Sequence, residues 1–255
     1  MAVKRLSIMV PALNEQDNIS NAIENVVKAF HKLNVSGEII VVNDGSTDRT
    51  ASIVEGLMGK YPFIQLVYHE KPQGIGASYW DGIWKSEGEI VTMIPGDGEN
   101  DTYEVLRYLP LMDHVDIVIP FIYNRNVRSW SRRLISKLYK GIINLSFGML
   151  LNYMNGNVIY RKCILQDITL KSRGFFYQTE LLIRTLKNGY LYAEVPCALQ
   201  QRSSGRSKAL TFKSLLRVIR GYLYMVVSVY LFDNKNKHIA SDSITALRYR
   251  KLEEK

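Results

Sequence analysis

Short runs of β-branched and other apolar residues alternate with amphipathic stretches through the first 120 residues. The runs span 6–12, 38–46, 63–70, 89–97 and 116–123, and each has the length of a buried strand. Between the first two runs, apolar residues recur at helical spacing: Ile19, Ala22, Ile23, Val26, Val27 and Phe30. Further helices are predicted around 53–57, over 76–88 and around 105–109. This alternation is typical of βαβ units and predicts an α/β fold with a mostly parallel central sheet.

Four of the predicted strands are followed directly by polar motifs. These read PALNE at 11–15, NDGSTD at 43–48, HEKPQG at 69–74 and PGDGEND at 95–101. Because the carboxyl ends of parallel strands meet at one edge of a sheet, we expect the four motifs to line one ligand-binding crevice. The alternative is that each motif is a solvated turn, since Asp-Gly after a strand is ordinary turn chemistry.

The carboxylates of these motifs suit a nucleotide and a metal ion. The chain has neither GxGxxG after the first strand nor GxxxxGK[ST], which disfavours dinucleotide and P-loop sites. Glu15 and Asp44 could instead contact a base and ribose, while Asp97 and Glu99 hold a divalent cation that bridges a diphosphate. Mg²⁺ or Mn²⁺ fits, because hard cations take carboxylate oxygens and are often shared with substrate phosphates.

Taken together, the motifs resemble those of family 2 glycosyltransferases, which have the Rossmann-like GT-A fold. The likeness is strongest to polyprenyl-phosphate and dolichol-phosphate sugar (mannose) synthases. Besides PALNE and PGDGEND, it is carried by VVNDGSTDRT at 41–50, GIGAS…DG within 74–82, RRLIS at 132–136, EVP at 194–196 and RSSGRSK at 202–208. The resemblance implies a glycosyltransferase domain over residues 1–210, followed by an amphipathic segment and a basic tail over 211–255.

The resemblance also implies a donor site. Its residues would be Pro11, Leu13, Glu15, Val42, Asp44, Gly96, Asp97, Arg202 and Lys208. The family's Asp-Ala-Asp-x-Gln metal stretch falls on residues 95–99, where Pro95 replaces the first aspartate and Glu99 replaces the amide. Proline offers no side-chain ligand, so the metal-binding role passes to Asp97 and Glu99.

Basic residues in the second half are predicted to contact phosphate groups. The resemblance assigns Arg202 and Lys208, together with Asp97, to catalysis at the donor diphosphate. For the acceptor phosphate it assigns Arg128, Arg132, Ser136 and Arg206. The family's arginine shortly after the fifth strand has no clear counterpart, and Arg125 and Arg128 are both near enough to substitute for it. Arginine grips phosphate with two donors, whereas lysine acts as a point charge. A solvated loop is the alternative for 202–208.

Two segments combine a basic stripe with an apolar face. Arg133, Lys137 and Lys140 share their spacing with Lys213, Arg217 and Arg220, and the apolar run GYLYMVVSVYLF follows the second set. This run has about a dozen residues, whereas a bilayer-spanning helix needs roughly 20. The segments are therefore predicted to lie on a membrane surface as amphipathic helices. Buried helices with solvated edges are the alternative.

The charge and composition of the chain indicate which kinds of partner it binds. The net charge of +9 and the pI of about 9.4 favour an anionic partner. No helix-turn-helix, RRM or zinc pattern is present, so we expect no nucleic acid. Cys163 and Cys197 lack CxxC spacing, and the start of the chain lacks a secretion signal, which together predict reduced thiols in the cytoplasm. The sequence leaves open whether the chain forms a homo-oligomer.

These features predict an inverting glycosyltransferase on the inner face of a membrane, which moves a sugar from a nucleotide-diphospho-sugar to a polyprenyl phosphate. An ionised phosphate acceptor needs no general base. One alternative is transfer to a saccharide hydroxyl, which would need a base such as Glu180 or Asp101. Another is a catalytically inactive nucleotide-binding module at a membrane. The sequence does not distinguish GDP from UDP donors, and it identifies neither the sugar nor the length of the lipid.

Overall fold

A seven-stranded mixed sheet forms the centre of the computed structural model, which describes residues 6–124, 130–198, 212–232 and 239–254. The strands are β1 (Leu6–Ala12), β2 (Gly37–Asn43), β3 (Ile64–Tyr68), β4 (Ile90–Met93), β5 (Ile117–Ile122), β6 (Ile159–Arg161) and β7 (Tyr192–Cys197). Their order is β3-β2-β1-β4-β6-β5-β7, and β6 alone runs antiparallel to its neighbours. The predicted α/β fold with a mostly parallel sheet is confirmed.

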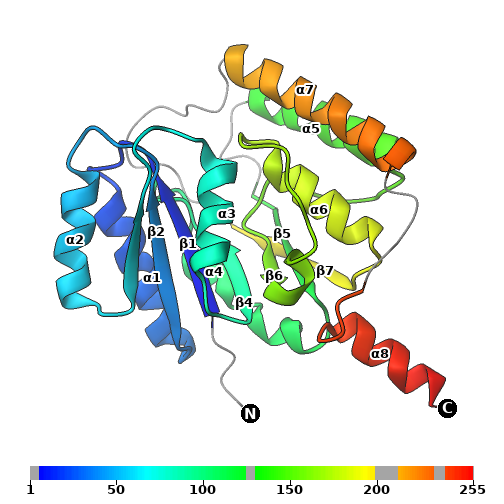
Figure 1. The fold of residues 1–255 in the computed structure, drawn as a ribbon, viewed down its shortest axis with the longest axis horizontal. Helices are drawn as coiled ribbons and strands as arrows, with labels where there is room; N and C mark the ends of the chain where they lie inside the picture. Colours follow the sequence, from blue (N-terminus) through cyan, green and yellow to red (C-terminus); the bar gives the residue numbers. More distant parts are fainter. Residues whose placement is uncertain (1–5, 125–129, 199–211, 233–238, 255) are drawn as a thin grey trace.

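Helices cover both faces of the sheet (Figure 1). They are α1 (Ile19–Leu33), α2 (Thr50–Lys60), α3 (Ile75–Lys85), α4 (Thr102–Leu106), α5 (Trp130–Phe147), α6 (Tyr177–Lys187), α7 (Phe212–Val227) and α8 (Ile244–Glu253). Strand β1 contributes side chains to two hydrophobic core clusters. Ile8 and Val10 pack in one cluster with α1, whereas Met9 packs in a second cluster with α3 and α6. Both faces of this strand are therefore buried, which explains its nearly continuous apolar run.

Shorter helical segments complete the fold. The 3₁₀ helices η1 (Leu109–Asp113) and η3 (Lys162–Leu165) precede β5 and follow β6, and the π-helical turn η4 (Ser228–Phe232) ends α7. Helix α1 ends before the left-handed residue Asn34, and Gly37 begins β2. A Cβ at Gly37 would lie 2.5 Å from the carbonyl oxygen of Leu6, so glycine allows β1 and β2 to start side by side.

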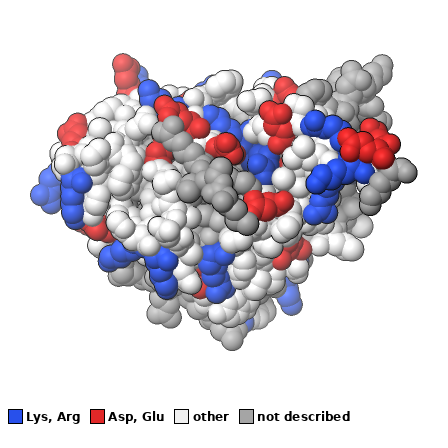
Figure 2. Space-filling model, turned by 90° about the horizontal axis from the view of Figure 1, so that it is seen from below, with Lys and Arg blue, Asp and Glu red and all other residues white. Residues whose placement is uncertain are grey.

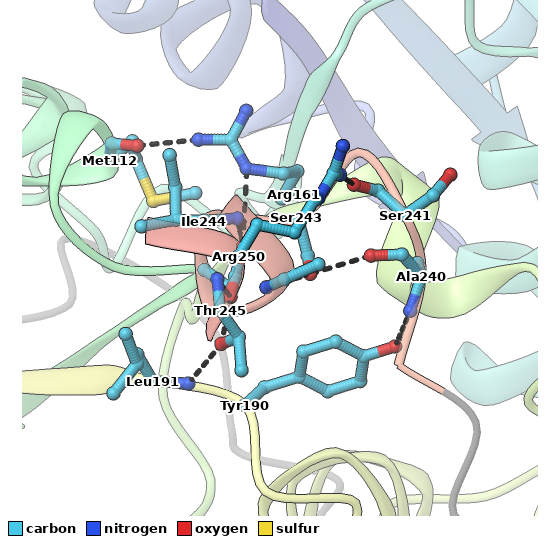
Figure 3. A network of polar contacts seen from close by, with 12 residues as sticks. Met112, Arg161, Tyr190, Leu191, Ala240, Ser241, Ser243, Ile244, Thr245 and Arg250 are labelled. Carbon is cyan, nitrogen blue, oxygen red and sulfur yellow. Dashed lines mark hydrogen bonds and ion pairs between the residues drawn. The ribbon is translucent and has the colours of Figure 1, made fainter. Parts of the chain in front are cut away.

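Polar contacts that include Arg161, Leu191 and Thr245 surround the start of the C-terminal helix (Figure 3). Asp116, which is fully buried before β5, accepts hydrogen bonds from the backbone nitrogens of Ile244 (2.7 Å) and Thr245 (2.9 Å). These N–H groups belong to the first turn of α8, where a negative charge is favourable. Arg161 pairs with the same carboxylate at 3.3 Å. The start of α8 is thus attached to the sheet.

Helices α5 and α7 lie side by side (Figure 1). The hydroxyl groups of Ser146 and Tyr222 are 2.8 Å apart, and the Phe147 ring stacks on Tyr230. Met225 on α7 is fully buried in the larger core cluster. The opposite sides of both helices expose large apolar residues: Trp130, Leu134, Ile135, Leu138, Ile142 and Leu145 on α5, and Leu215, Leu216, Ile219, Leu223, Tyr224 and Val227 on α7.

Candidate active site

The four polar motifs meet at the carboxyl ends of β1 to β4. Strands β3, β2, β1 and β4 are neighbours in that order, so the loops that follow them are neighbours too. Backbone hydrogen bonds join them: Asp44 N donates to Ala12 O (2.9 Å), Gly96 N to Pro11 O (3.1 Å) and His69 N to Asn43 O (2.9 Å). The convergence expected from the sequence is therefore present in the structure.

The loops after β1 and β2 are bound to each other by side chains. Asn14, at a positive φ of 54°, accepts from Thr47 N (2.8 Å) and its own N–H donates to Ser46 Oγ (2.9 Å). Asp48 accepts from Gln16 N (3.1 Å) and from Thr50 N (3.0 Å). Burial alone would raise the pKa of Asp48, but the hydrogen bonds from Thr50 and Gln16 outweigh it and lower that pKa. These polar groups hold the two loops in one arrangement.

Asp44 is buried beneath the loop that follows β3. Its Oδ1 accepts from Gln73 N (2.7 Å) and its Oδ2 from Gly74 N (2.9 Å), while His69 Nδ1 lies 2.8 Å from Oδ1. Gly45, at a φ of +72°, would place a Cβ 2.8 Å from the backbone of Lys71 and Pro72. The loop therefore packs closely over the end of β2, and Asp44 fixes its backbone.

The predicted metal ligands lie in the loop after β4. Asp97 and Glu99 are both partly exposed, and Asp97 Oδ1 accepts from Glu99 N at 3.1 Å in a tight turn that includes Gly98 at a φ of +71°. Within the described residues, no three His, Cys, Asp or Glu side chains are grouped to hold a metal ion. Two carboxylates nevertheless fit Mg²⁺ or Mn²⁺, because such ions commonly take one or two protein carboxylates and complete their shell with water and substrate phosphates.

The remaining predicted donor residues occupy different environments at this edge. Glu15 is partly exposed and its Oε2 accepts from Asn18 Nδ2 at 2.9 Å. Leu13 is partly exposed beside it, whereas Pro11 and Val42 are buried partners in the β1–β2 ladder. Gly96 packs against α1, because a Cβ there would lie 2.9 Å from Ile19 Cδ1. Glu15 and Leu13 are thus partly accessible, whereas Pro11 and Val42 are enclosed in the sheet.

Glu180 has a positioning role that the sequence did not indicate. It is fully buried on α6, and its carboxylate accepts from Lys171 N (3.2 Å) and Ser172 N (2.9 Å) while pairing with Arg184 at 3.1 Å. The segment that it holds contacts the start of α3, where Gly76 N donates to Arg173 O at 2.8 Å. Asp101 is likewise engaged, since its side chain caps α4 at Tyr103 N (2.9 Å). The carboxylate of Glu180 is thus enclosed and engaged in structural contacts, whereas Asp101 is partly exposed.

The predicted phosphate-binding residues can be placed only in part. Arg128, Arg202, Arg206 and Lys208 lie outside the described residues, as does the side chain of Arg132. Ser136 is partly exposed on α5. The chain leading into 202–208 is described up to Ala198, whose N–H donates to Glu104 Oε2 at 3.2 Å. Helix α4, which follows the loop of Asp97 and Glu99, therefore also contacts Ala198, the last described residue before the basic segment.

Three groups at this edge were not predicted from the sequence. His69 joins Asp44 to Asp81 on α3, Asp48 joins two loops, and Asn14 adopts the left-handed conformation. Asn is enriched at positive φ, so Asn14 could have been suspected from its place after a strand. His69 bridges Asp44 and Asp81 only because the fold brings these residues together, so no local sequence pattern predicts the contact.

Comparisons with known proteins agree with this arrangement. Residues 7–175 match the model of Glycosyl transferase family 2. Polyprenol monophosphomannose synthase from Mycolicibacterium smegmatis is 28% identical over 80% of this chain and 81% of its own length. Undecaprenyl-phosphate 4-deoxy-4-formamido-L-arabinose transferase from Edwardsiella ictaluri is 25% identical over 81% of this chain, which spans 63% of that enzyme.

Solved structures share the fold. Glucosyl-3-phosphoglycerate synthase from Mycobacterium tuberculosis, in complex with Mg²⁺ and UDP, superimposes with a TM-score of 0.66 at 21% identity, covering 88% of this chain and 80% of that one. The same enzyme with Mn²⁺, UDP-glucose and phosphoglyceric acid gives a TM-score of 0.65 at 21% identity, with the same coverage. At this identity the likeness supports the GT-A-like fold and leaves the substrates of the present chain open.

Proposed function

Because the chain belongs to glycosyltransferase family 2, we propose that it transfers a sugar from a nucleotide-diphospho-sugar to a polyprenyl phosphate, with inversion at the anomeric carbon. The observation that carries this proposal is the meeting of four acid- and amide-bearing loops at one edge of the sheet, with Asp97 and Glu99 in the fourth. The names of two relatives, both enzymes that act on polyprenyl phosphates, support the lipid acceptor.

The donor would lie across the loops after β1, β2 and β4. Glu15, Leu13 and the region of Asp44 would bind the nucleoside, and Asp97 with Glu99 would hold Mg²⁺ or Mn²⁺. When bound, the cation would neutralise charge on the departing diphosphate. Arg202 and Lys208 are proposed to approach the same diphosphate, and Arg128, Arg132, Ser136 and Arg206 the acceptor phosphate.

The proposed acceptor chemistry follows from the charge of a lipid phosphate. An oxygen of the lipid phosphate would bond to the anomeric carbon as the bond to the donor diphosphate breaks, which releases a nucleoside diphosphate. A phosphate monoester has a second pKa near 6, so it is already an anionic nucleophile at neutral pH. The burial and internal hydrogen bonds of Glu180 disfavour one form of the alternative, transfer to a saccharide hydroxyl assisted by that group.

Helices α5 and α7 would bring this site to a lipid acceptor. Their exposed apolar residues and the basic residues Lys137, Arg217 and Arg220 are the combination expected of helices that lie in a membrane surface. Across the parts of the chain that the structure describes, no helix is both long and apolar enough to cross a bilayer. The proposed association is therefore with one membrane surface, and we propose that it is the cytoplasmic one.

The proposal is tested by supplying radiolabelled UDP- and GDP-sugars, Mn²⁺ and polyprenyl phosphate to the purified protein. We expect label in an organic-extractable, mild-acid-labile product. Asp97→Asn and Glu99→Gln should each lower the rate about 100-fold, in the range seen when one electrostatic contact to the transition state is removed. Glu89→Gln is the matched control, because Glu89 is exposed at the opposite end of β4 and should leave the rate unchanged.

Two outcomes would contradict the proposal. Label that enters only free saccharide would identify the hydroxyl-transferring alternative. Nucleotide binding without transfer to any acceptor, unaffected by either substitution, would identify a catalytically inactive binding module.

A further inference from the structure

His69 connects two carboxylates that come from different elements. We propose that its ring carries a proton on each nitrogen and acts as a positioning residue, clamping Asp44 at the end of β2 to Asp81 on α3. The clamp would hold the loop after β3, next to the proposed binding site of the donor nucleotide. Its effect on donor binding rests on the function proposed above, whereas the protonation of the ring does not.

The geometry places an acceptor against each ring nitrogen. Nδ1 lies 2.8 Å from Asp44 Oδ1, and Nε2 lies 3.0 Å from Asp81 Oδ2. The side chains of His69 and Asp44 are 5% and 6% exposed, whereas that of Asp81 is 45% exposed. One contact is therefore enclosed by protein, and the other is open to water at one end.

The hydrogen-bonding capacity of each group then determines which ring nitrogens of His69 carry a proton. An ionised carboxylate can only accept hydrogen bonds, and a neutral imidazole has one donor and one acceptor nitrogen. Asp44 already accepts from Gln73 N and Gly74 N, and such bonds favour its ionised form. Asp81 reaches water, where a carboxylate is ionised at neutral pH. Both contacts are satisfied together only when the ring donates from both nitrogens.

The clamp has consequences for the loop over β2. Asp44 fixes the backbone of Gln73 and Gly74, and Gly74 is the residue from which α3 begins. Asp81 lies farther along α3, so His69 ties the helix to the same carboxylate that orients its first turn. The neighbouring charged residues Glu70 and Lys71 are exposed, and Asp44 and Asp81 are the charged groups hydrogen-bonded to the ring.

The protonation state can be observed without any substrate. The chain has four histidines, so ¹⁵N-labelled histidine resonances can be assigned to His69 by their loss in His69→Gln. At pH 7 we expect both ring nitrogens of His69 to show the chemical shift of an N–H group. A bare nitrogen at either position would overturn the proposal, whatever the enzyme transfers.

Positioning is tested by the affinity for UDP-glucose and GDP-mannose, each measured with Mn²⁺ by titration calorimetry. His69→Gln should weaken binding of whichever nucleotide sugar the wild type takes by about 10- to 100-fold, the cost of losing a hydrogen bond to a charged group. His114→Gln is the matched control, because His114 is exposed after η1 and should leave affinity unchanged.

Asp81→Asn provides a readout that a purely structural role would not move. The amide that this substitution introduces can donate to a bare ring nitrogen, which an ionised carboxylate cannot do. At pH 7 we therefore expect Nε2 of His69 to lose the chemical shift of an N–H group in this variant, while Nδ1 keeps it through Asp44. N–H shifts at both ring nitrogens in Asp81→Asn would overturn the proposal.

The two proposals fail in different ways. If the wild type binds neither nucleotide sugar while both ring nitrogens carry protons, the proposed function is wrong and the clamp stands. If the wild type binds a nucleotide sugar and His69→Gln binds it equally well, the clamp has no positioning role and the proposed function is unaffected.

Discussion

The polar side chains at the carboxyl edge of the sheet differ in their burial and in the hydrogen bonds that they accept. Asp44, Asp48 and Asn14 are occupied by backbone N–H groups of neighbouring loops. Asp97 and Glu99 lie partly exposed in a turn of their own. Much of the acidic character of these motifs therefore stabilises the loops. The turn interpretation describes Asp44, Asp48 and Asn14, and the binding of a ligand by Asp97 and Glu99 stays a prediction.

The stabilising role of the Asp48 hydrogen bonds can be tested by measuring stability at different pH values. Its lowered pKa means that its hydrogen bonds add stability above the ordinary value of 3.8, and that this stability is lost as the pH falls through the lower folded-state pKa. Asp48→Asn should reduce the free energy of unfolding by about 1 kcal/mol at pH 7. The difference from wild type should shrink as the pH falls below 3.8.

Chemical denaturation across this pH range measures the effect. Asp17→Asn serves as the control, because Asp17 is exposed in the same β1–α1 loop and should change stability little. A loss for Asp48→Asn that stayed constant from pH 7 to pH 3 would show that its carboxylate charge is not the cause.

Among the elements, helix α3 packs especially closely against the segment before α6. A Cβ at Gly76 would lie 2.7 Å from Ser172 O and 2.8 Å from Tyr177 Cβ, and a Cβ at Gly74 would lie 2.6 Å from Arg173 O. The same segment contacts α7, where a Cβ at Gly221 would lie 2.8 Å from Phe176 Cδ1. Segment 172–177 thus lies between the start of α3 and the proposed membrane-facing helix.

Gly76→Ala should destabilise the protein, because its methyl group would overlap backbone atoms that cannot rotate away. We expect a loss of about 1–3 kcal/mol in the free energy of unfolding, as for other overpacked sites. Gly59→Ala is the control: it is also within a helix, but nothing lies within 4 Å of its Cβ position. This substitution should stabilise by about 0.5–1 kcal/mol through helix propensity. Equal effects at the two sites in denaturant titrations would contradict the close contact.

The protein as a whole presents two unlike surfaces. Helices α5 and α7 lie on one side and expose large apolar residues (Figure 1). The view from below, on the side away from these helices, shows Lys and Arg interspersed with Asp and Glu (Figure 2). A surface of mixed charge suits solvent, whereas a contiguous apolar face indicates an interaction site. The asymmetry supports an orientation with α5 and α7 toward lipid.

Vesicle sedimentation tests this orientation. The wild type should bind vesicles containing anionic phosphatidylglycerol, and the double variant Leu138→Asp/Leu223→Asp should bind at least about tenfold more weakly, because two exposed leucines would no longer enter the interface. Leu252→Asp on α8 changes an equally exposed leucine on another helix and should bind as the wild type does. Unchanged binding by the double variant would place the lipid contact elsewhere.

Local patterns in the sequence were sufficient to predict the strands of the first half. They were also sufficient to predict that the polar motifs lie at one edge of the sheet. Each apolar run from 6 to 123 became a strand, and the polar motif after each of the first four lies at its carboxyl end. This works because side-chain periodicity and turn chemistry act over a few residues, and because parallel strands joined by helices have their carboxyl ends on one side. The family resemblance drawn from those motifs is confirmed by the match over 7–175.

Long-range contacts determined the rest. Strand β6 has three residues, too few for a recognisable period, yet it enters antiparallel between β4 and β5 and separates the parallel strands. Asp116 binds the start of α8 across 128 residues of chain, and Asp44 meets Gly74 across 30. Whether a carboxylate holds a loop or remains open to a ligand depends on which distant N–H groups the fold brings to it. That information resides in three-dimensional packing, because residue type and spacing are the same in either case.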